Sequence, residues 1–424
     1  MPLKRTKTMN KNNHKDLDIP QEQGMDPLDH RVLARRLDLY HIEEDAPGMI
    51  YWHAAGWQIY RELEDYIRGR MRGLGYGEVR SPQLLPQSLW EASGHWEKFG
   101  ENMFAVPARE EGGRDMALKP MSCPCHLQIF NSDLRSWRDL PMRIAEFGQC
   151  HRDEASGSMH GLMRTKAFEQ DDAHVICDPG QVRGEVARFV ELLKEVYAAL
   201  GFADFEVALS LRPEKRAGND ADWDHAEQEL LGAALSCGLD PKLQLGEGAF
   251  YGPKLEFALR DKKGRSWQCG TIQLDMVLPG RLGASYVGKD GAKHEPVMLH
   301  HAVLGSLGRF IGILLEHCEG RLPLWLAPVQ VAVLPIGDDQ RDAAVDVMDQ
   351  LRAAGLRPAL FDQSEGLGRR IVMVRDQLIP VQIVIGKLEV ERGEVMLQIG
   401  GGKEALSPAA AIARMGELVG VPKG

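Results

Sequence analysis

Residues 142–177 read MRIAEFGQCHRDEASGSMHGLMRTKAFEQDDAHVIC. Both ends of this stretch have the composition of β-strands, and the middle, ASGSMHG at 155–161, has that of a polar loop. We therefore expect one strand at 142–154 and a second at 162–177, paired around the loop.

Polar side chains recur at every second position of the second strand, and so lie on one face of the sheet. The polar members are Arg164, Lys166, Gln170, Asp172 and His174, and the aromatic Phe168 lies on the same face. Buried polar groups need partners, so this row is typical of a ligand site, although a solvated sheet face would also accommodate it. On the first strand Arg152 could neutralise a phosphate, and Glu154 could accept a hydrogen bond from an amine.

Further helices and strands surround this pair. An apolar residue at every fourth position from Ile59 to Met71 indicates an amphipathic helix closed by Gly73 and Gly75. The run GEVRSPQLL at 77–85 predicts a short strand whose Pro82 belongs at an edge or an interface, because proline cannot donate to a ladder. Other strands are expected at 205–211, 250–259 and 266–278, and helices at 179–202 and 300–318.

Beyond residue 330 the pattern changes to alternating strands and helices, which predicts a small α/β domain of about 95 residues. The larger part before it is α+β, with antiparallel strands following one another. We divide the chain into a disordered leader at 1–25, a first domain at 26–325 and a second at 326–424.

Composition restricts the class of protein. The chain has 424 residues, 44% of them hydrophobic, and a net charge of −10, so a nucleic-acid partner would need a locally basic face. Seven unevenly spaced cysteines argue against a disulfide framework and for a reducing compartment. Neither a membrane span nor the apolar core of a signal peptide is present, and we expect a cytoplasmic protein.

The segment MSCPCH holds Cys123, Cys125 and His126 within four positions. Two cysteines that chelate one zinc are usually separated by two residues, as in C-x₂-C. Only one residue separates Cys123 from Cys125, so this pair is too close together to supply two ligands. One cysteine combined with distant histidines could hold a metal with an open coordination position, whereas a buried, inert cysteine is the alternative.

Several motifs together resemble the threonyl-tRNA synthetases, which are class II aminoacyl-tRNA synthetases. They are MSCPCHLQIF, the 142–177 stretch, RPEKRAG, LGEGAFYGPKLEF, WQCGTIQLD and HHAVLGSLGRFIGILLEH. The resemblance implies a class II catalytic domain, an antiparallel sheet flanked by helices, followed by an anticodon-binding-type α/β domain. It also implies a homodimer through the first class II motif, where Pro82 lies.

The resemblance implies a ligase that activates L-threonine with ATP and transfers it from threonyl-adenylate to tRNA(Thr). Zinc would be held by Cys123, His174 and His300, and would bind threonine through its amino and hydroxyl groups. A site that requires the hydroxyl rejects valine by a factor of ~10⁴ or more. The residues implied around the amino acid are Gln170, Asp172, Tyr251, Gln273 and Met121.

The same resemblance implies how ATP and Mg²⁺ are bound. Arg152 would hold the α-phosphate, Glu154 would read the adenine amine, and Phe168 would stack on the base. The full implied set for ATP is Arg152, Glu154, Arg164, Phe168, Lys254, Gln268 and Arg309, with Arg152, Arg309 and Lys254 as the catalytic residues. The plainer alternatives are an Arg309 paired with a carboxylate and a Phe168 that belongs to the core.

Three departures from the family pattern affect the expected function. We expect a protein without the family's N-terminal editing region, and therefore measurable activation of serine. Residues 331–424 carry 11 Lys and Arg against 13 Asp and Glu, a net charge of −2, which leaves Arg369, Arg370 and Arg375 to contact RNA. Cys125 and Gly308 stand where a glycine and a larger, often acidic residue are usual. A threonine-activating enzyme with a non-tRNA acceptor and a non-catalytic regulator are therefore the alternatives.

Overall fold

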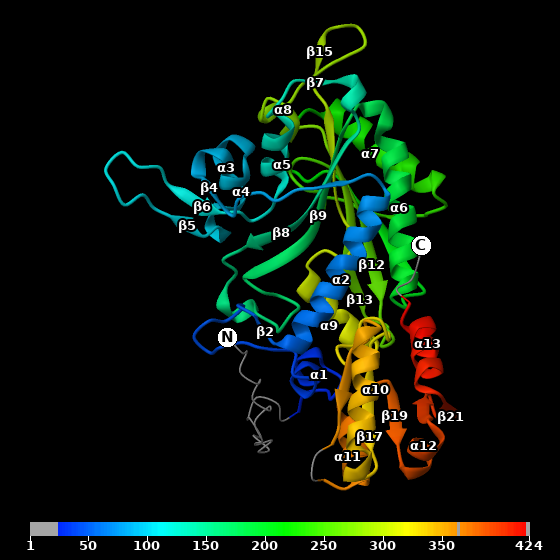
Figure 1. Cartoon of the computed structure of the whole chain (residues 1–424). Helices are drawn as coiled ribbons and strands as arrows, with labels where there is room; N and C mark the ends of the chain where they lie inside the picture. The colour runs from blue at the N-terminus through cyan, green and yellow to red at the C-terminus, as the bar shows by residue number, and fades with distance from the viewer. Residues whose placement is uncertain (1–23, 363–364, 421–424) are drawn as a thin grey trace.

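One large sheet organises most of the chain, with strand order β11-β10-β12-β13-β16-β9-β8-β3. The computed structural model in Figure 1 describes residues 24–362 and 365–420, so the predicted leader lies outside the described residues except for its last two. The strands are β3 (Gly77–Glu78), β8 (Met142–His151), β9 (Ala167–Cys177), β10 (Phe205–Ser210), β11 (Lys242–Gln244), β12 (Lys254–Arg260), β13 (Ser266–Asp275) and β16 (Val297–Ala302). Neighbours are antiparallel except β10 with β11 and β3 with β8.

Helices cover one face of this sheet and form the main core with it. They are α1 (His30–Arg36), α2 (Ala54–Gly73), α6 (Val182–Ala199), α7 (Asp220–Ser236) and α9 (Leu307–His317). On β9 the odd-numbered Ala173, Val175 and Cys177 face this core, as a period of two requires. The predicted antiparallel sheet flanked by helices is therefore confirmed.

The opposite face packs against α5 (Cys123–Phe130), which brings the MSCPCH segment over the sheet. The even-numbered Ile144 and Ile176 form a second apolar cluster there with Leu127 and Phe130 of α5. Smaller elements flank it: α3 (Gln87–Ser93), α4 (His95–Phe99), α8 (Leu278–Arg281), β4 (Leu84–Pro86), β5 (Ala105–Val106), β6 (Met116–Leu118), β7 (Arg135–Ser136), β14 (Tyr286–Val287) and β15 (Lys293–His294).

Three local predictions were wrong. The central hairpin has a longer loop than expected, since β8 ends at His151 and β9 begins at Ala167. Residues 300–302, expected in a helix, belong to strand β16, and the helix begins at Leu307. Pro82 lies between β3 and β4, exposed and outside both strands, rather than within one continuous strand.

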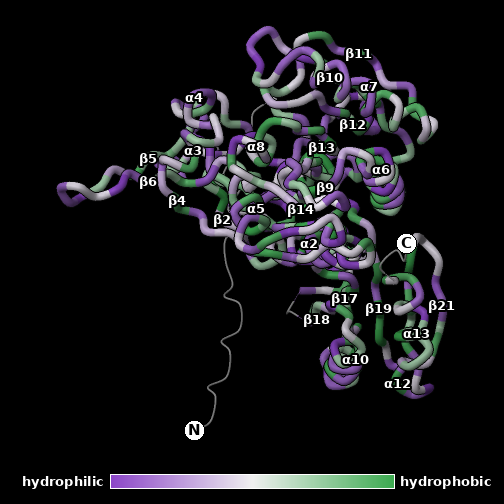
Figure 2. The backbone as a smooth tube through the Cα atoms, turned by 90° about the horizontal axis from the view of Figure 1, so that it is seen from above, coloured by the Kyte–Doolittle hydropathy of each residue, from purple (hydrophilic) through white to green (hydrophobic). Residues whose placement is uncertain are grey.

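A second, smaller unit stands beside the first and contains a five-stranded mixed sheet of order β18-β17-β19-β20-β21 (Figure 2). Its elements are β17 (Val331–Pro335), α10 (Arg341–Ala353), β18 (Pro358–Leu360), α11 (Leu367–Asp376), β19 (Val381–Ile385), α12 (Lys387–Arg392), β20 (Val395–Ile399), β21 (Gly402–Leu406) and α13 (Pro408–Val419). Helices α10 and α13 pack on one face, and α11 packs on the other. The predicted α/β architecture is confirmed, although β21 was not anticipated.

The stretch 321–330 connects the two cores. Trp325 and Leu326 belong to the first core, and Val331 begins the second. Arg357 of the second unit donates to Glu62 of α2 at 2.6 Å and to the carbonyl oxygen of Trp325. Within the described residues no helix is both long enough and apolar enough to cross a membrane.

Candidate functional site

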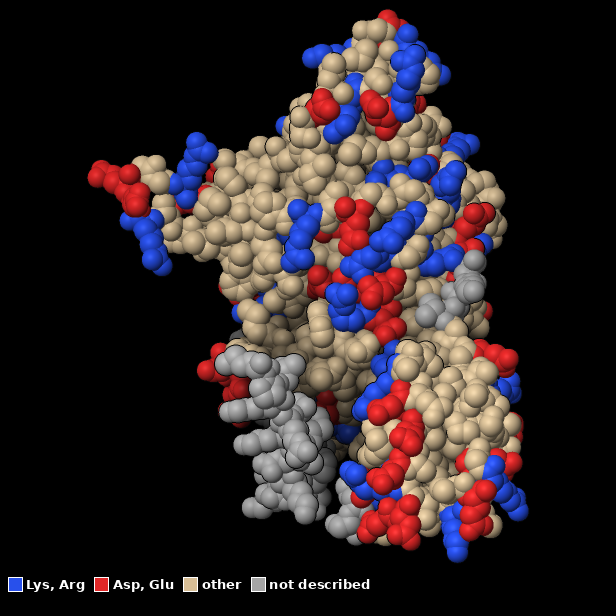
Figure 3. Space-filling model, viewed as in Figure 1, with Lys and Arg blue, Asp and Glu red and all other residues tan. Residues whose placement is uncertain are grey.

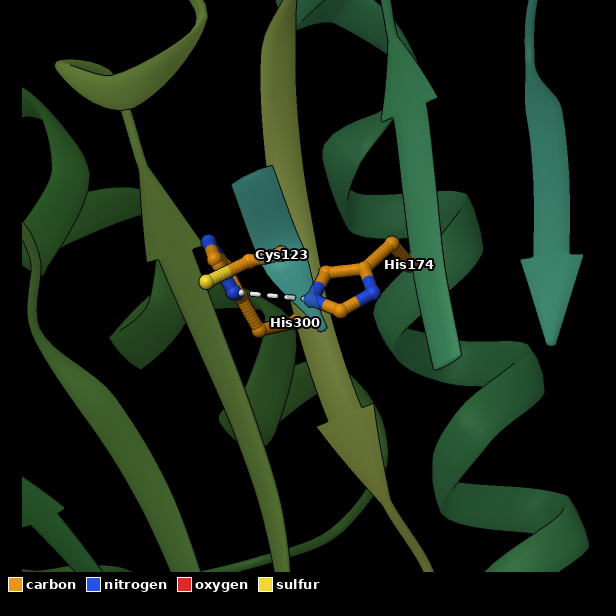
Figure 4. Close-up of side chains that lie close together, drawn as sticks. All are labelled: Cys123, His174 and His300. Atoms are coloured by element: carbon orange, nitrogen blue, oxygen red, sulfur yellow. Dashed lines mark hydrogen bonds between the residues drawn. The ribbon is translucent and has the colours of Figure 1, made fainter. Parts of the chain in front are cut away.

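A thiol and two imidazoles converge on the face of the sheet that α5 covers (Figure 4). The ligand atoms of Cys123, His174 and His300 all lie within 4.8 Å of one another, and the three residues are buried. His174 on β9 and His300 on β16 are cross-strand neighbours, and Cys123 is the first residue of α5. The structure thus brings together the three residues that the sequence named as a metal set.

The geometry of these donors suits a tetrahedral metal. The Nε2 atom of His174 lies 3.0 Å from the Nδ1 atom of His300, and two nitrogens bound to one zinc lie about 3.3 Å apart. Burial lowers the pKa of His174 well below its usual value, which keeps the imidazole in the neutral form that binds metals. Burial also raises the pKa of the Cys123 thiol in the protein alone.

Both histidines are held by further hydrogen bonds. His300 donates from Nε2 to Asp275 at 3.0 Å, and Asp275 also accepts from the backbone N–H groups of Val277 and Leu278. His174 contacts His126 through the two Nδ1 atoms at 2.7 Å, and His126 contacts Glu146 at 3.1 Å. Cys125, by contrast, points into a separate apolar cluster with Trp90 and is not among the three converging donors.

His95 is a further residue beside the thiol that the sequence did not single out. Its Nε2 atom lies 3.6 Å from the sulfur of Cys123, and its Nδ1 atom contacts the hydroxyl of Ser93 at 2.8 Å. Burial lowers the pKa of His95 to about 3, so its imidazole is neutral at physiological pH.

The residues predicted around an amino acid lie near this cluster. Asp172 accepts the backbone N–H of Ser122, next to Cys123, at 3.2 Å. Gln273 is the cross-strand partner of His300 and donates to the carbonyl oxygen of Gly252. The ring of Tyr251 lies 5.2 Å from that of His300.

The remaining two occupy the same region. Gln170 lies on β9 on the face that carries His174, and Met121 packs against the apolar cluster beneath α5.

The residues predicted for the adenine and α-phosphate lie at the mouth of the hairpin. The guanidinium of Arg152 lies 5.1 Å above the ring of Phe168 and donates to the carbonyl oxygen of Pro120. Arg164 and Glu154 pair with each other at 2.6 Å. Because β8 ends at His151, these cations stand on the loop between the strands and not on the strands themselves.

The residues predicted for the pyrophosphate end come from β12, β13 and α9. Lys254 pairs with Glu256 at 2.7 Å, and Gln268 donates to the same carboxylate, so Glu256 joins these two predicted side chains. Arg309, in the first turn of α9, has a buried Nε atom without a hydrogen-bond partner among the described residues. The carboxylate pairing considered as the plainer alternative for Arg309 is therefore not seen there.

Asp171 lies on the face of β9 opposite the predicted row of polar side chains, and it is buried. It accepts three backbone N–H groups, from Val303, Leu304 and Gly305, at 2.8–2.9 Å. Burial raises the pKa of Asp171 to about 7, although these donors act in the opposite direction. The residue fixes the turn that leads into α9 and so places Arg309. Its position in the sequence gave no signal of this.

The second unit does not have a basic face in the visible view of Figure 3, where acidic and basic side chains alternate over it. Arg370, expected to contact RNA, is 5% exposed, and its guanidinium donates to the carbonyl oxygens of Pro335 and Phe361. That expectation was wrong, and Arg369 and Arg375 are the exposed members of the predicted set.

Comparison with known proteins identifies the class. Residues 104–318 match the tRNA synthetase class II core domain (G, H, P, S and T), and residues 330–410 match the anticodon binding domain. The fold and the site therefore define a class II aminoacyl-tRNA synthetase core followed by an anticodon-binding domain, as the predicted fold class states.

Individual relatives narrow the class to one family. The chain is 52% identical over 376 residues to the threonine–tRNA ligase of Methylococcus capsulatus and 54% identical over 366 residues to that of Cereibacter sphaeroides. These alignments cover 89% and 86% of this chain but 58% and 57% of the two relatives, so the chain spans less than two thirds of their length. The crystal structure of the RNA binding domain of threonyl-tRNA synthetase from Cryptosporidium parvum superposes with a TM-score of 0.90 at 36% identity, covering 93% of this chain and 99% of that one. The chain belongs to the threonine–tRNA ligase family.

Proposed function

We propose that this chain activates L-threonine with ATP to threonyl-adenylate and transfers the threonyl group to tRNA(Thr). The observation that carries the proposal is the cluster of Cys123, His174 and His300 on the same sheet face as Gln170 and Asp172. A hydroxyl-reading metal site beside amino-acid-binding carboxylate and amide groups is the arrangement that threonine selection needs.

The donor set fits zinc. One thiolate and two imidazoles form a three-ligand site, which leaves a fourth position open, as in catalytic zinc centres. Zinc bound there would supply a Lewis-acidic position for the amino and hydroxyl groups of threonine. Asp172, which accepts the N–H of Ser122 next to the ligand Cys123, would hold the ammonium or amine of the substrate close to that position.

The cations of the site would align ATP with the threonine carboxylate. Arg152 packs against Phe168, so the guanidinium and the ring would bind the α-phosphate and the adenine side by side. The Nε atom of Arg309 has no hydrogen-bond partner in the described part of the chain and is a donor suited to a nucleotide oxygen. Arg164 and Glu154 would separate when ATP arrives, since each is proposed to bind a different part of it. Lys254 and Gln268, with Mg²⁺, would contact the pyrophosphate end.

The partners proposed are tRNA, through residues 330–410, and a second copy of the chain. The short strand β3 lies at the edge of the large sheet, where a strand can pair with another chain, and the exposed Pro82 follows it, a surface suited to a homodimer. A cytoplasmic location is proposed with this function. Light scattering after gel filtration would distinguish a dimer from a monomer.

Threonine-dependent ATP–pyrophosphate exchange, measured beside aminoacylation of tRNA(Thr), tests the proposed function. We expect both activities, with valine at least ~10⁴-fold below threonine in exchange. Exchange without aminoacylation would contradict tRNA as the acceptor, and absence of both would contradict the proposal as a whole.

A further inference from the structure

The two imidazoles of the proposed metal site differ in what holds them. His300 contacts the carboxylate of Asp275 directly, whereas His174 reaches the carboxylate of Glu146 only through a third imidazole, that of His126. Metal-binding histidines usually donate their second N–H to a carboxylate or a carbonyl oxygen. An imidazole can accept such a bond only if its own proton is on the other nitrogen.

The contacts of Glu146 determine where that proton lies. A carboxylate accepts hydrogen bonds, so His126 must donate from Nε2 to Glu146 and leave its Nδ1 atom bare. His174 then donates from Nδ1 to the Nδ1 atom of His126, and the lone pair of its Nε2 atom points at His300. The same reasoning for Asp275 leaves the Nδ1 atom of His300 bare.

Glu146 is itself held in place by groups other than His126. It accepts the backbone N–H and the hydroxyl of Ser81 at 2.9 and 2.8 Å and pairs with the ammonium of Lys119 at 3.0 Å. Glu146 is 3% exposed and Lys119 is fully buried. The carboxylate therefore has a fixed orientation toward His126 and keeps its charge.

We propose that His126 is a positioning residue for the metal site, which directs the lone pair of His174 Nε2 toward the metal by accepting the Nδ1–H of His174. The inference rests on the proposed metal site of Cys123, His174 and His300. It also accounts for the compact MSCPCH segment, because Cys123 and His126 are three residues apart on α5 and so lie on the same face of one helical turn. Cys123 supplies a ligand, and His126 orients another.

His126 accepts a hydrogen bond from His174 and donates one to Glu146, and two substitutions of similar size test these two bonds separately. In His126→Asn the amide oxygen can replace Nδ1 as the acceptor for His174, whereas in His126→Gln the longer amide can reach Glu146 but leaves His174 without that acceptor. We expect His126→Gln to weaken zinc binding about 10- to 100-fold, and His126→Asn to weaken it less than about 10-fold. Zinc affinity is measured by competition with a chromophoric chelator on the full chain.

A matched control uses Leu127→Ala, which truncates a fully buried neighbour on the same helix without touching the hydrogen bonds. It should lower the melting temperature while keeping wild-type zinc affinity. The absorption bands of the Co²⁺-substituted protein give a second readout, and only His126→Gln should change them.

The outcomes discriminate between the two proposals. If the wild-type chain binds one zinc and His126→Gln binds it as tightly, the positioning role is overturned and the proposed function stands. Equal losses in His126→Asn and His126→Gln would also overturn it. If the wild-type chain binds no zinc, the metal site of the proposed function fails, and the positioning role fails with it.

Discussion

Replacing Glu146 by Gln removes the carboxylate that pairs with the buried ammonium of Lys119. Burial by itself would raise the pKa of Glu146, but hydrogen bonds from His126 and Ser81 and the charge of Lys119 lower it from 4.5 to about 2. Such a difference between folded and unfolded states corresponds to about 3 kcal/mol of folding free energy at pH 7. Since the side chain is 3% exposed, solvent screening does not reduce this value much.

We therefore expect Glu146→Gln to lower the free energy of unfolding at pH 7 by about 3 kcal/mol, the lower end of the cost of breaking a buried ion pair. The sign of the pH dependence follows from the lowered pKa. The contribution of Glu146 is fully present above pH 4.5 and is lost as the pH falls toward 2, so the difference in unfolding free energy between the two proteins should shrink by about 1 kcal/mol between pH 7 and pH 4.

Urea unfolding followed by circular dichroism, with a chelator present so that metal binding does not contribute, measures this gap. A second variant, Lys119→Met combined with Glu146→Gln, removes both charges. It should be more stable than Glu146→Gln alone, because no buried ammonium is left unpaired. A gap below about 1 kcal/mol at pH 7, or one that widens toward pH 4, would refute the reasoning.

Four further predictions concern the site and the second unit. Cys123→Ser should bind less zinc and lose selection of threonine over valine, while its circular dichroism spectrum stays that of the wild type; global unfolding would contradict the proposed role. Serine should support ATP–pyrophosphate exchange within ~10⁴-fold of threonine, because it keeps the hydroxyl and loses only a methyl group. Arg369→Ala should weaken tRNA binding in a filter-binding assay without changing the melting temperature. Arg370→Ala should lower the melting temperature, because the carbonyl oxygens of Pro335 and Phe361 lose their donor.

Alternation along one strand was enough to predict which side of the sheet carries the site. Ala173 and Val175 face the main core and Ile176 faces α5, so the even positions of β9 lie where the sequence placed them. The ends of the hairpin loop could not be predicted in this way. Lys166 accepts the backbone N–H of Arg152 across the hairpin, but it donates its own N–H to the carbonyl oxygen of Gly48, a residue more than a hundred positions earlier.

Periodicity also failed where burial is complete on both faces. All six residues of β16 are buried, and a run that is buried on both faces shows neither the period of a helix nor that of a half-exposed strand. His300 was nevertheless predicted as a metal ligand, because the resemblance of the surrounding motif placed it independently of the secondary structure. Asp275, which contacts His300, lies two residues after Gln273 on β13 and therefore on the same face of the sheet. The sequence indicates this position for Asp275 only once Gln273 has been assigned to the site.

The residues that support the ligands were the hardest to find because their partners come from distant segments. Glu146 did carry a signal, since it occupies a buried position between Ile144 and Gly148, where a charge requires compensation. Its compensating groups, however, lie 27 and 65 residues earlier, at Lys119 and Ser81, and no spacing rule connects them. A charged residue at a strand position that faces the core predicts a buried network of polar partners. The sequence does not show which side chains that network holds in place, because the fold brings them together. Here the network ends at His174, so the same buried carboxylate that stabilises the sheet also contributes to the order of the proposed metal site.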